Sequence, residues 1–168
     1  MTKNILFLAT LSLILFAVPA SLHAQATATG TASVVVEERA ITLTAVTPLN
    51  FGTVLAFGRA GSVTVSYTGT TSASSAHSSA PGTPGTFTAT GVPNAPYALT
   101  LPANGAVTVS NGTESMTLRS FTRTGSTSQL YFDAAGDASF SVGATLDVGA
   151  RQPQGTYTGT YDVTIDYN

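Results

Sequence analysis

After residue 24 the sequence predicts an all-β protein, an antiparallel β-sandwich assembled from many short strands. No helical periodicity is sustained there. Short runs of alternating apolar and polar residues recur instead, separated by Gly, Pro or Asn, which is typical of an antiparallel sandwich. The candidate strands are residues 41–46, 49–56, 62–67, 86–90, 97–101, 106–110, 115–121, 129–132, 138–148 and 156–167.

The last of these segments, residues 156–167, has the most regular alternation. One face carries Thr and Asp, and the other carries Tyr157, Gly159, Tyr161, Val163, Ile165 and Tyr167. One polar and one apolar face predict a strand with one side buried. The printed sequence stops one residue later, and a long edge with an apolar face favours association. We therefore expect a partner, from this chain or another, to cover the far edge of this strand.

Turn signals separate several of the strands. Asn104-Gly105 and Asn111-Gly112 predict hairpin turns, because glycine tolerates a positive φ. Residues 133–137 read as a short hairpin loop before Phe140. Residues 68–85 (TGTTSASSAHSSAPGTPG) contain almost nothing to bury and predict a flexible surface loop. The Ser, Thr and Pro content also permits a displayed or glycosylated loop, or one that contacts a neighbour.

The first 24 residues have the pattern of a signal-peptide helix. Lys3 supplies a weak positive start, residues 5–18 are apolar apart from Thr10 and Ser12, and Pro19 ends the run. Cleavage is expected after Ala24, or alternatively after Ala26. The alternative is an uncleaved anchor, although the run is short for a membrane span. We expect export through the inner membrane to the periplasm, then to the cell surface or outside, with no membrane span after cleavage.

Residues 25–38 form an N-terminal extension before the sandwich domain, residues 39–168. Small or apolar residues occupy every even position from 26 to 36, and hydroxyl residues occupy positions 27, 29, 31 and 33. The even positions are Ala26, Ala28, Gly30, Ala32, Val34 and Val36. The pattern breaks at the charged residues 37–39 and resumes on odd positions, which changes the face that a strand buries. This indicates two strands, the first of which is a candidate to pair with another copy.

The candidate donor strand has few bulky side chains. At about 0.8 kcal/mol per buried CH₂, its alanines contribute little, so Val34 and Val36 are expected to anchor it. The alternative without strand donation is that residues 26–36 form a frayed tail or the first strand of a self-contained sandwich.

The composition excludes several classes of partner. Beyond residue 24 there are five arginines, eight acids and no lysine, a net charge of −3. No basic patch is available for nucleic acid. Charged residues make up only 8% of the chain, against about 25% in an ordinary domain. The chain has no cysteine, so the fold must be stable without disulfides. A hydroxyl-rich, charge-poor surface suits packing against copies of itself or exposure outside the cell.

Beyond residue 24 the sequence has few residues of the types that usually act in catalysis, so we expect a protein that is not an enzyme. His77 is the one histidine beyond residue 24, and there is no cysteine or lysine nucleophile there. Asp162 and Asp166 share a strand face but lie about 13 Å apart at about 3.3 Å per residue, too far for paired acid–base work. Asp133 and Asp137 are too few ligands for a typical calcium loop. No catalytic, cofactor or metal residue is predicted.

Ordered motifs along the chain resemble a known bacterial family. They are LNFG at 49–52, GSVTV at 61–65, FTATG at 87–91, YALTLP at 97–102, FSVGATL at 140–146 and GTYTGTYDVTIDY at 155–167. This order resembles the domain-of-unknown-function family DUF4402, a relative of the spore-coat-protein-U and fimbrial-subunit domains. The resemblance implies a secreted immunoglobulin-like or pilin-like β-sandwich, complete or lacking one strand.

The end of the sequence is also similar to subunits of chaperone–usher pili. Tyr167 is penultimate, apolar residues alternate before it, and Gly155 is fourteenth from the end. In that family a periplasmic chaperone recognises the last strand, an outer-membrane usher follows, and the N-terminal strand of the next subunit completes the sandwich. The resemblance implies that residues 26–36 donate the strand. It also implies a chaperone- or donor-facing last strand with Gly155, Tyr161, Val163, Ile165 and Tyr167.

The expected function is therefore a structural subunit of a secreted surface fibre or coat that assembles with itself or related subunits by donor-strand exchange. A self-contained, monomeric surface sandwich is one alternative. A carbohydrate-binding adhesin module is another, although the chain has no Trp to offer a sugar.

Overall fold

The structure is a computed structural model that describes residues 26–36, 40–74, 77–78, 80–125 and 129–168, without the side chains of residues 77 and 78. The predicted signal-peptide helix and the charged residues 37–39 lie outside the described residues. The chain divides into two units, residues 1–36 and 37–168. In the first unit, the described residues 26–36 are exposed and contain no strand.

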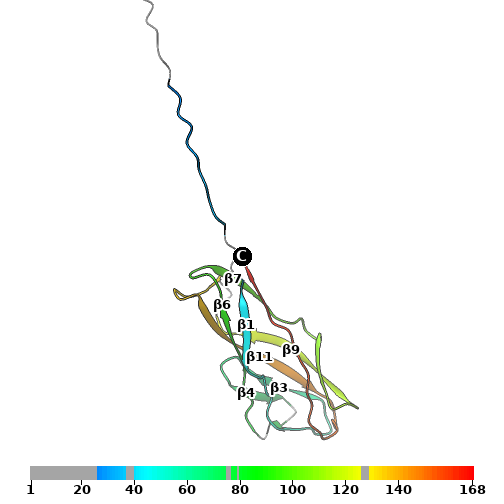
Figure 1. Cartoon of the computed structure of the whole chain (residues 1–168). Coiled ribbons are helices and arrows are strands. Elements are labelled where there is room, and N and C mark those ends of the chain that lie inside the picture. The colour runs from blue at the N-terminus through cyan, green and yellow to red at the C-terminus, as the bar shows by residue number, and fades with distance from the viewer. Residues whose placement is uncertain (1–25, 37–39, 75–76, 79, 126–128) are drawn as a thin grey trace, which may run out of the picture. The chain divides into compact units, whose positions relative to one another are not determined.

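The second unit is all-β, as predicted, and its described residues include no helix. Antiparallel strands form two main sheets and a small third one (Figure 1). The large sheet has the order β1-β6-β11-β3-β4, with β9 also on β11 and β8 on β9; the others are β10-β7-β12 and β2-β5. The strands are β1 (Thr42–Thr47), β2 (Val54–Leu55), β3 (Gly61–Val65), β4 (Thr71–Ser74), β5 (His77–Ser78), β6 (Gly85–Thr90), β7 (Pro96–Thr100), β8 (Val107–Ser110), β9 (Ser115–Arg123), β10 (Leu130–Tyr131), β11 (Asp137–Val148) and β12 (Thr164–Tyr167).

Strand β11 is the spine of the sandwich. It pairs with β6 along its first half, from Asp137 to Val142, and with β3 along its second half, from Ala144 to Val148. Strand β9 also pairs with β11 over residues 142–147. The central residues of β11 are buried on both faces of the sheet, whereas the outer strands alternate between more and less buried residues. A strand covered on both sides reads as a nearly continuous run of apolar and small residues.

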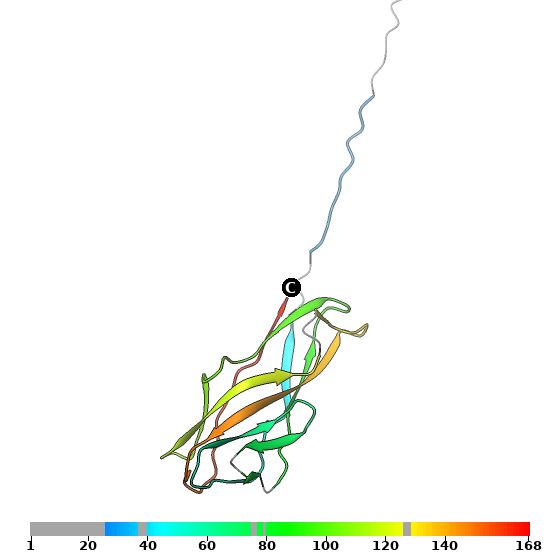
Figure 2. The same cartoon turned by 180° about the vertical axis from the view of Figure 1, so that it is seen from behind.

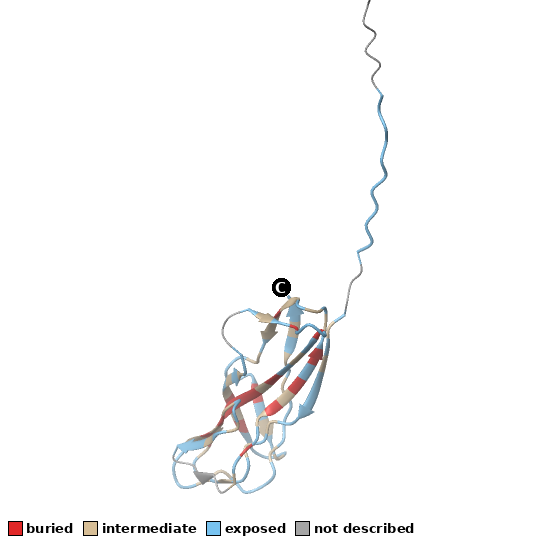
Figure 3. Ribbon diagram, turned by 90° about the vertical axis from the view of Figure 1, so that its left-hand side faces the viewer, coloured by how far each residue is buried: buried red, intermediate tan, exposed pale blue. Residues whose placement is uncertain are grey.

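The core lies on one face of the large sheet, where the β10-β7-β12 sheet covers one half and residues such as Leu49, Phe51 and Tyr157 cover the other. Figure 3 shows buried positions concentrated on the central strands. Aromatic rings fill one half of the core: Phe87 stacks on Phe140 with ring centroids 5.3 Å apart, and Tyr97 packs on Phe132 at 4.7 Å. Aliphatic residues fill the other half, including Val63, Leu118 and Leu146. With no disulfide, the fold is stabilised by this apolar burial and by the strand ladders.

The structure corrects part of the turn assignment. Asn111-Gly112 joins the paired strands β8 and β9 as predicted, and Gly112 has a φ of 95°. Asn104-Gly105 also turns, with a φ of 79° at Gly105, but β7 and β8 on either side of it do not pair with each other. Residues 133–137 are likewise a corner between sheets, because β10 pairs with β7 and β11 pairs with β6.

Residues 68–85 also differ from the prediction of a connection without secondary structure. Strand β4 lies within them and pairs with β3 from Val65↔Thr71 to Ser62↔Ser74. Strand β5 follows and pairs with β2. The prediction failed because β4 (TSAS) has only one apolar residue and covers an edge of the sheet without contributing to the core.

Candidate strand-docking site

Several strands, such as β4 and β10, pair on one side only among the described residues, and β1 and β12 are two of them. Strand β1 pairs with β6 on one side only. Strand β12 pairs with β7 on one side only. Figures 1 and 2 show β1 in cyan and the last segment in red, both running along the same part of the sandwich. Unpaired edges present free N–H and C=O groups that can accept another strand.

The last segment, residues 157–167, forms a shorter strand than predicted. One edge of this segment is nevertheless paired near both of its ends. Residues 164–167 pair with β7, and Thr158 pairs with Ser110 at the end of β8. Strands β7 and β8 therefore follow the same side of this segment in succession. Between these pairings, residues 101–106 and the last segment line a cavity of about 320 Å³ that is open to solvent; Leu101, Ala106, Tyr161 and Asp162 are among its lining residues. The predicted continuous strand over 156–167 is interrupted at this cavity.

The inward-facing side chains along both unpaired edges are only partly covered. On the β1 side these seam residues are Ile41, Leu43, Leu49 and Phe51, and on the last segment they are Tyr157, Tyr161, Val163 and Ile165. All of them pack against the buried clusters from one side. Ala45 is the clearest case: it lies opposite the buried Phe87 on β6, and it is nevertheless exposed.

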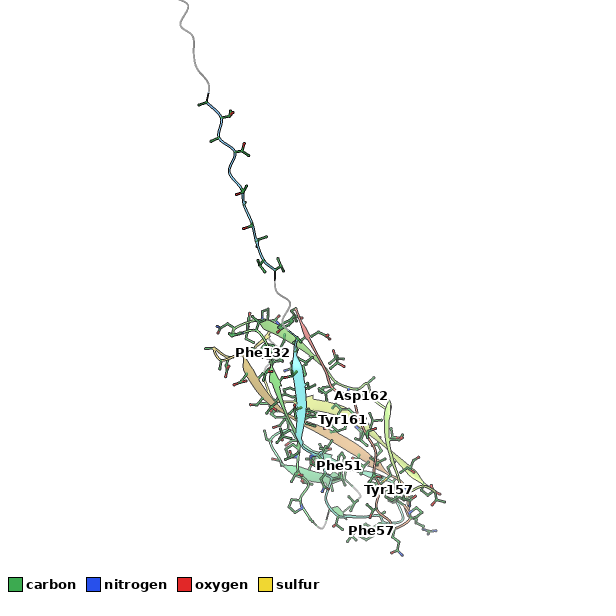
Figure 4. All side chains as sticks on the ribbon, viewed as in Figure 1. Phe51, Phe57, Phe132, Tyr157, Tyr161 and Asp162 are labelled. Atoms are coloured by element: carbon green, nitrogen blue, oxygen red, sulfur yellow. The ribbon has the colours of Figure 1, made fainter. Side chains whose placement is uncertain are left out.

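Tyr161 lies at the middle of this seam, between Phe51 and Phe132 in Figure 4. Its ring packs against Phe87 (6.1 Å between centroids) and Phe121 (5.6 Å). Its hydroxyl lies directly over Gly85, where a Cβ would collide with it. Burial raises the pKa of Tyr161, because the phenolate is poorly solvated there. The Tyr161 side chain therefore fills part of the seam.

Tyr167 fixes the end of the last strand. Its hydroxyl accepts a hydrogen bond of 2.8 Å from the Val92 N–H, and its ring lies 6.0 Å from Phe132. Tyr167 is still 38% exposed. Gly155 does not join this row of side chains: it lies in the preceding loop against the side chain of Asn111.

The candidate donor residues lie in the exposed first unit. Val34 is 84% exposed and Val36 is 87% exposed, and Gly30 has nothing within 4 Å of the position of a Cβ. Sequence reasoning identified the last strand but missed the β1 side of the seam. The signal was present, because Ile41 and Leu43 alternate with threonines, but alternation cannot tell a half-covered edge from a buried one.

Other chemistry is sparse in the described part of the chain. No three His, Cys, Asp or Glu side chains gather there. Arg119 donates to both carboxylate oxygens of Asp147 at 2.8 and 3.0 Å, an exposed pair on neighbouring strands β9 and β11. His77 lies in β5, and its side chain is outside the described ones. Within the same residues, no helix is long and apolar enough to cross a membrane.

Comparison with known families gives one match, and it spans the whole sandwich. A model of the family described as "Domain of unknown function (DUF4402)" matches residues 41–167, from the residue before β1 to the end of β12. The chain belongs to the DUF4402 family. The matched region leaves out residues 26–36 and includes every strand of the sandwich. No curated protein and no solved structure matches the chain.

Proposed function

We propose that this DUF4402 protein is a non-enzymatic subunit of an exported surface fibre or coat, in which residues 26–36 of one copy dock between β1 and the last segment of another. One observation carries the proposal: both unpaired edges hold inward-facing side chains, such as Ala45 and Val163, that the chain itself leaves partly uncovered. An added strand would pair with both edges through its main chain.

The length and side-chain pattern of residues 26–36 support this occupant. Residues 26–36 and 157–167 are equal in length. If residue 26 lies opposite Tyr167 in an antiparallel pair, Ala32 lies opposite Tyr161 and Val34 opposite Gly159. Small donor residues then meet the bulky ring, and the larger valine meets a position without a side chain. Because side chains alternate in a strand, the even positions all face inward in this register.

The position where the chain enters the sandwich favours the antiparallel direction. Strand β1 begins at Thr42 opposite Thr90, beside the loop that holds Val92 and the hydroxyl of Tyr167. A donor antiparallel to the last segment therefore enters at this end and leaves at the other. The next sandwich then follows at the far end, so copies add in one direction. A parallel donor would instead leave the acceptor at the end where β1 begins. Both neighbours of a sandwich would then lie at that same end, where they would collide and stop growth.

Residues 1–24 fit an export signal in this proposal, and a periplasmic chaperone that covers the same seam before assembly would keep the subunit soluble. Exposed strand edges are prone to uncontrolled pairing, so temporary cover is needed. The resemblance to fimbrial subunits suggests such a chaperone and an outer-membrane usher as partners.

The test compares the mature full chain with a variant that lacks residues 25–36, by light scattering after size exclusion. We expect multimers that survive heating in detergent from the full chain only, and a folded monomer from the deletion. The deletion variant accepts a donor but offers none, so adding it during assembly should shorten the multimers in proportion to its share. Multimers that form without residues 25–36, or that are unaffected by the variant, would contradict donation. Stable monomers from both would identify a self-contained sandwich.

A further inference from the structure

The two ends of the sandwich differ in charge. At one end, the corner before β11 holds Asp133 and Asp137, and Asp166 lies next to it near the end of β12. Hydrogen bonds join these parts: Gly91 N–H donates to the Gly136 carbonyl at 2.8 Å, and Val92 N–H donates to the Tyr167 hydroxyl. The carboxylates of Asp137 and Asp166 are in exposed residues. Arg123, which lines a pocket with Tyr97 and Asn168 at this end, lowers the negative charge but leaves the end negative. We call Asp133, Asp137 and Asp166 the acidic end.

The opposite end holds Arg59 and Arg151, both exposed. Arg59 lies in the loop before β3 and Arg151 in the loop after β11, and the two loops are joined by a hydrogen bond of 2.7 Å from Arg151 N–H to the Phe57 carbonyl. Glu114 in the neighbouring β8–β9 turn lowers the charge of this basic end but leaves it positive. Strand β11 runs from Asp137 at one end to Val148 at the other, about 36 Å at about 3.3 Å per residue.

Each end also exposes apolar side chains. At the basic end Phe57 is 52% exposed and Leu55 48%, and Figure 4 places Phe57 far from Phe132, which lies near the acidic end. At the acidic end Tyr131 is 60% exposed and Val92 36%. Aromatic and aliphatic groups beside opposite charges are the usual composition of a protein–protein contact. In a chain so poor in charge, this separation gives the two ends complementary surfaces.

We propose that the basic end of one copy docks on the acidic end of the next, as a second contact between consecutive subunits. The order of the ends rests on the proposed antiparallel donation, which brings the basic end of the acceptor to the acidic end of the following copy. Docked strands alone would leave consecutive sandwiches joined by residues 37–40. The end contact would set the angle between them, and opposite charges would orient the approach.

Charge reversal in the full chain tests this contact. Variant A carries Arg59→Asp and Arg151→Asp, so both of its ends are acidic. Variant B carries Asp137→Arg and Asp166→Arg, so both of its ends are basic. Asp133 is kept, because its carboxylate accepts the N–H groups of Ala135 and Asp137 and holds the corner. The double variant Arg119→Asp and Asp147→Arg is the matched control: it also reverses two charges, but it exchanges the members of one ion pair on β9 and β11 and leaves the net charge of both ends unchanged.

Association is followed by sedimentation velocity at low and high salt, and heat-resistant multimers are followed separately. We expect variants A and B alone to lose the salt-sensitive association, with an apparent constant about tenfold weaker, and their equimolar mixture to regain it. The control should match the unmodified chain. Unchanged association of A and B, or a mixture no stronger than either alone, would overturn the end contact. If heat-resistant multimers never form but the mixture still associates, strand donation fails and the end contact stands.

Discussion

Replacing Val34 by alanine should weaken the assembled multimer about tenfold. The substitution removes two carbons, worth roughly 1.6 kcal/mol at about 0.8 kcal/mol per buried CH₂. Val34 is 84% exposed in the free chain, so nearly all of this area remains to be buried on docking. The loss is then about 1.3 kcal/mol, close to the 1.4 kcal/mol that corresponds to a factor of ten. Adding Val36→Ala should bring the loss to roughly a hundredfold.

Val35→Ala is the matched control, because it removes the same two carbons from the neighbouring residue, which is 82% exposed. In a docked strand its side chain points away from the core, so we expect little change. The assay is the rate at which preformed multimers dissociate into monomers in dilute detergent, measured over a temperature series. The reasoning is refuted if Val35→Ala is as harmful as Val34→Ala, or if neither changes the rate, since both results mean that the even positions are not the buried ones.

Three further predictions concern the seam itself. Tyr167→Phe removes the hydroxyl that accepts the Val92 N–H and should lower the free energy of unfolding by about 1 kcal/mol in a urea titration; no change would mean that water replaces the bond fully. Gly85→Ala places a Cβ against the Tyr161 hydroxyl and should destabilise the fold by roughly 1–3 kcal/mol, with part of the loss recovered when Tyr161→Phe is added. Burial raises the pKa of Tyr161 and of Tyr97 above the ordinary tyrosine value. The free energy of unfolding should therefore be constant below the ordinary value and fall as the pH rises through the higher pKa values of the folded protein. Unfolding monitored by ultraviolet absorbance at a series of pH values tests this.

The strands that bury a face could be predicted from the sequence. Strands β6, β7, β9 and β11 lie within a residue or two of the alternating runs, because period-two burial is written directly in the side chains. Tyr161, Val163 and Ile165 could be assigned to the inward face of the last segment for the same reason.

Features set by pairing partners could not be predicted in this way. Strand β4 was missed because TSAS satisfies an edge by backbone hydrogen bonds without burying much. Residues 133–137 have a sequence that suits either a hairpin loop or a corner between two sheets. Which of these forms depends on the strands with which β10 and β11 pair. The break in the last segment depends on residues 101–106, which are more than 50 positions away in the sequence, so local periodicity carries no sign of it.

The small side chains of residues 26–32 agree with the proposed role once Tyr161 is considered. A seam without an aromatic bridge would need bulky donor side chains to reach the core. Here the Tyr161 ring already packs on Phe87 and Phe121, and its hydroxyl extends to Gly85. The space left beside it suits alanine or glycine, because a larger donor would have to displace the ring. Tyr161→Ala should therefore reverse the preference and favour a donor with leucine in place of Ala32 over the natural strand. If the preference is unchanged in a competition between the two donor peptides, Tyr161 does not determine which donor strand binds.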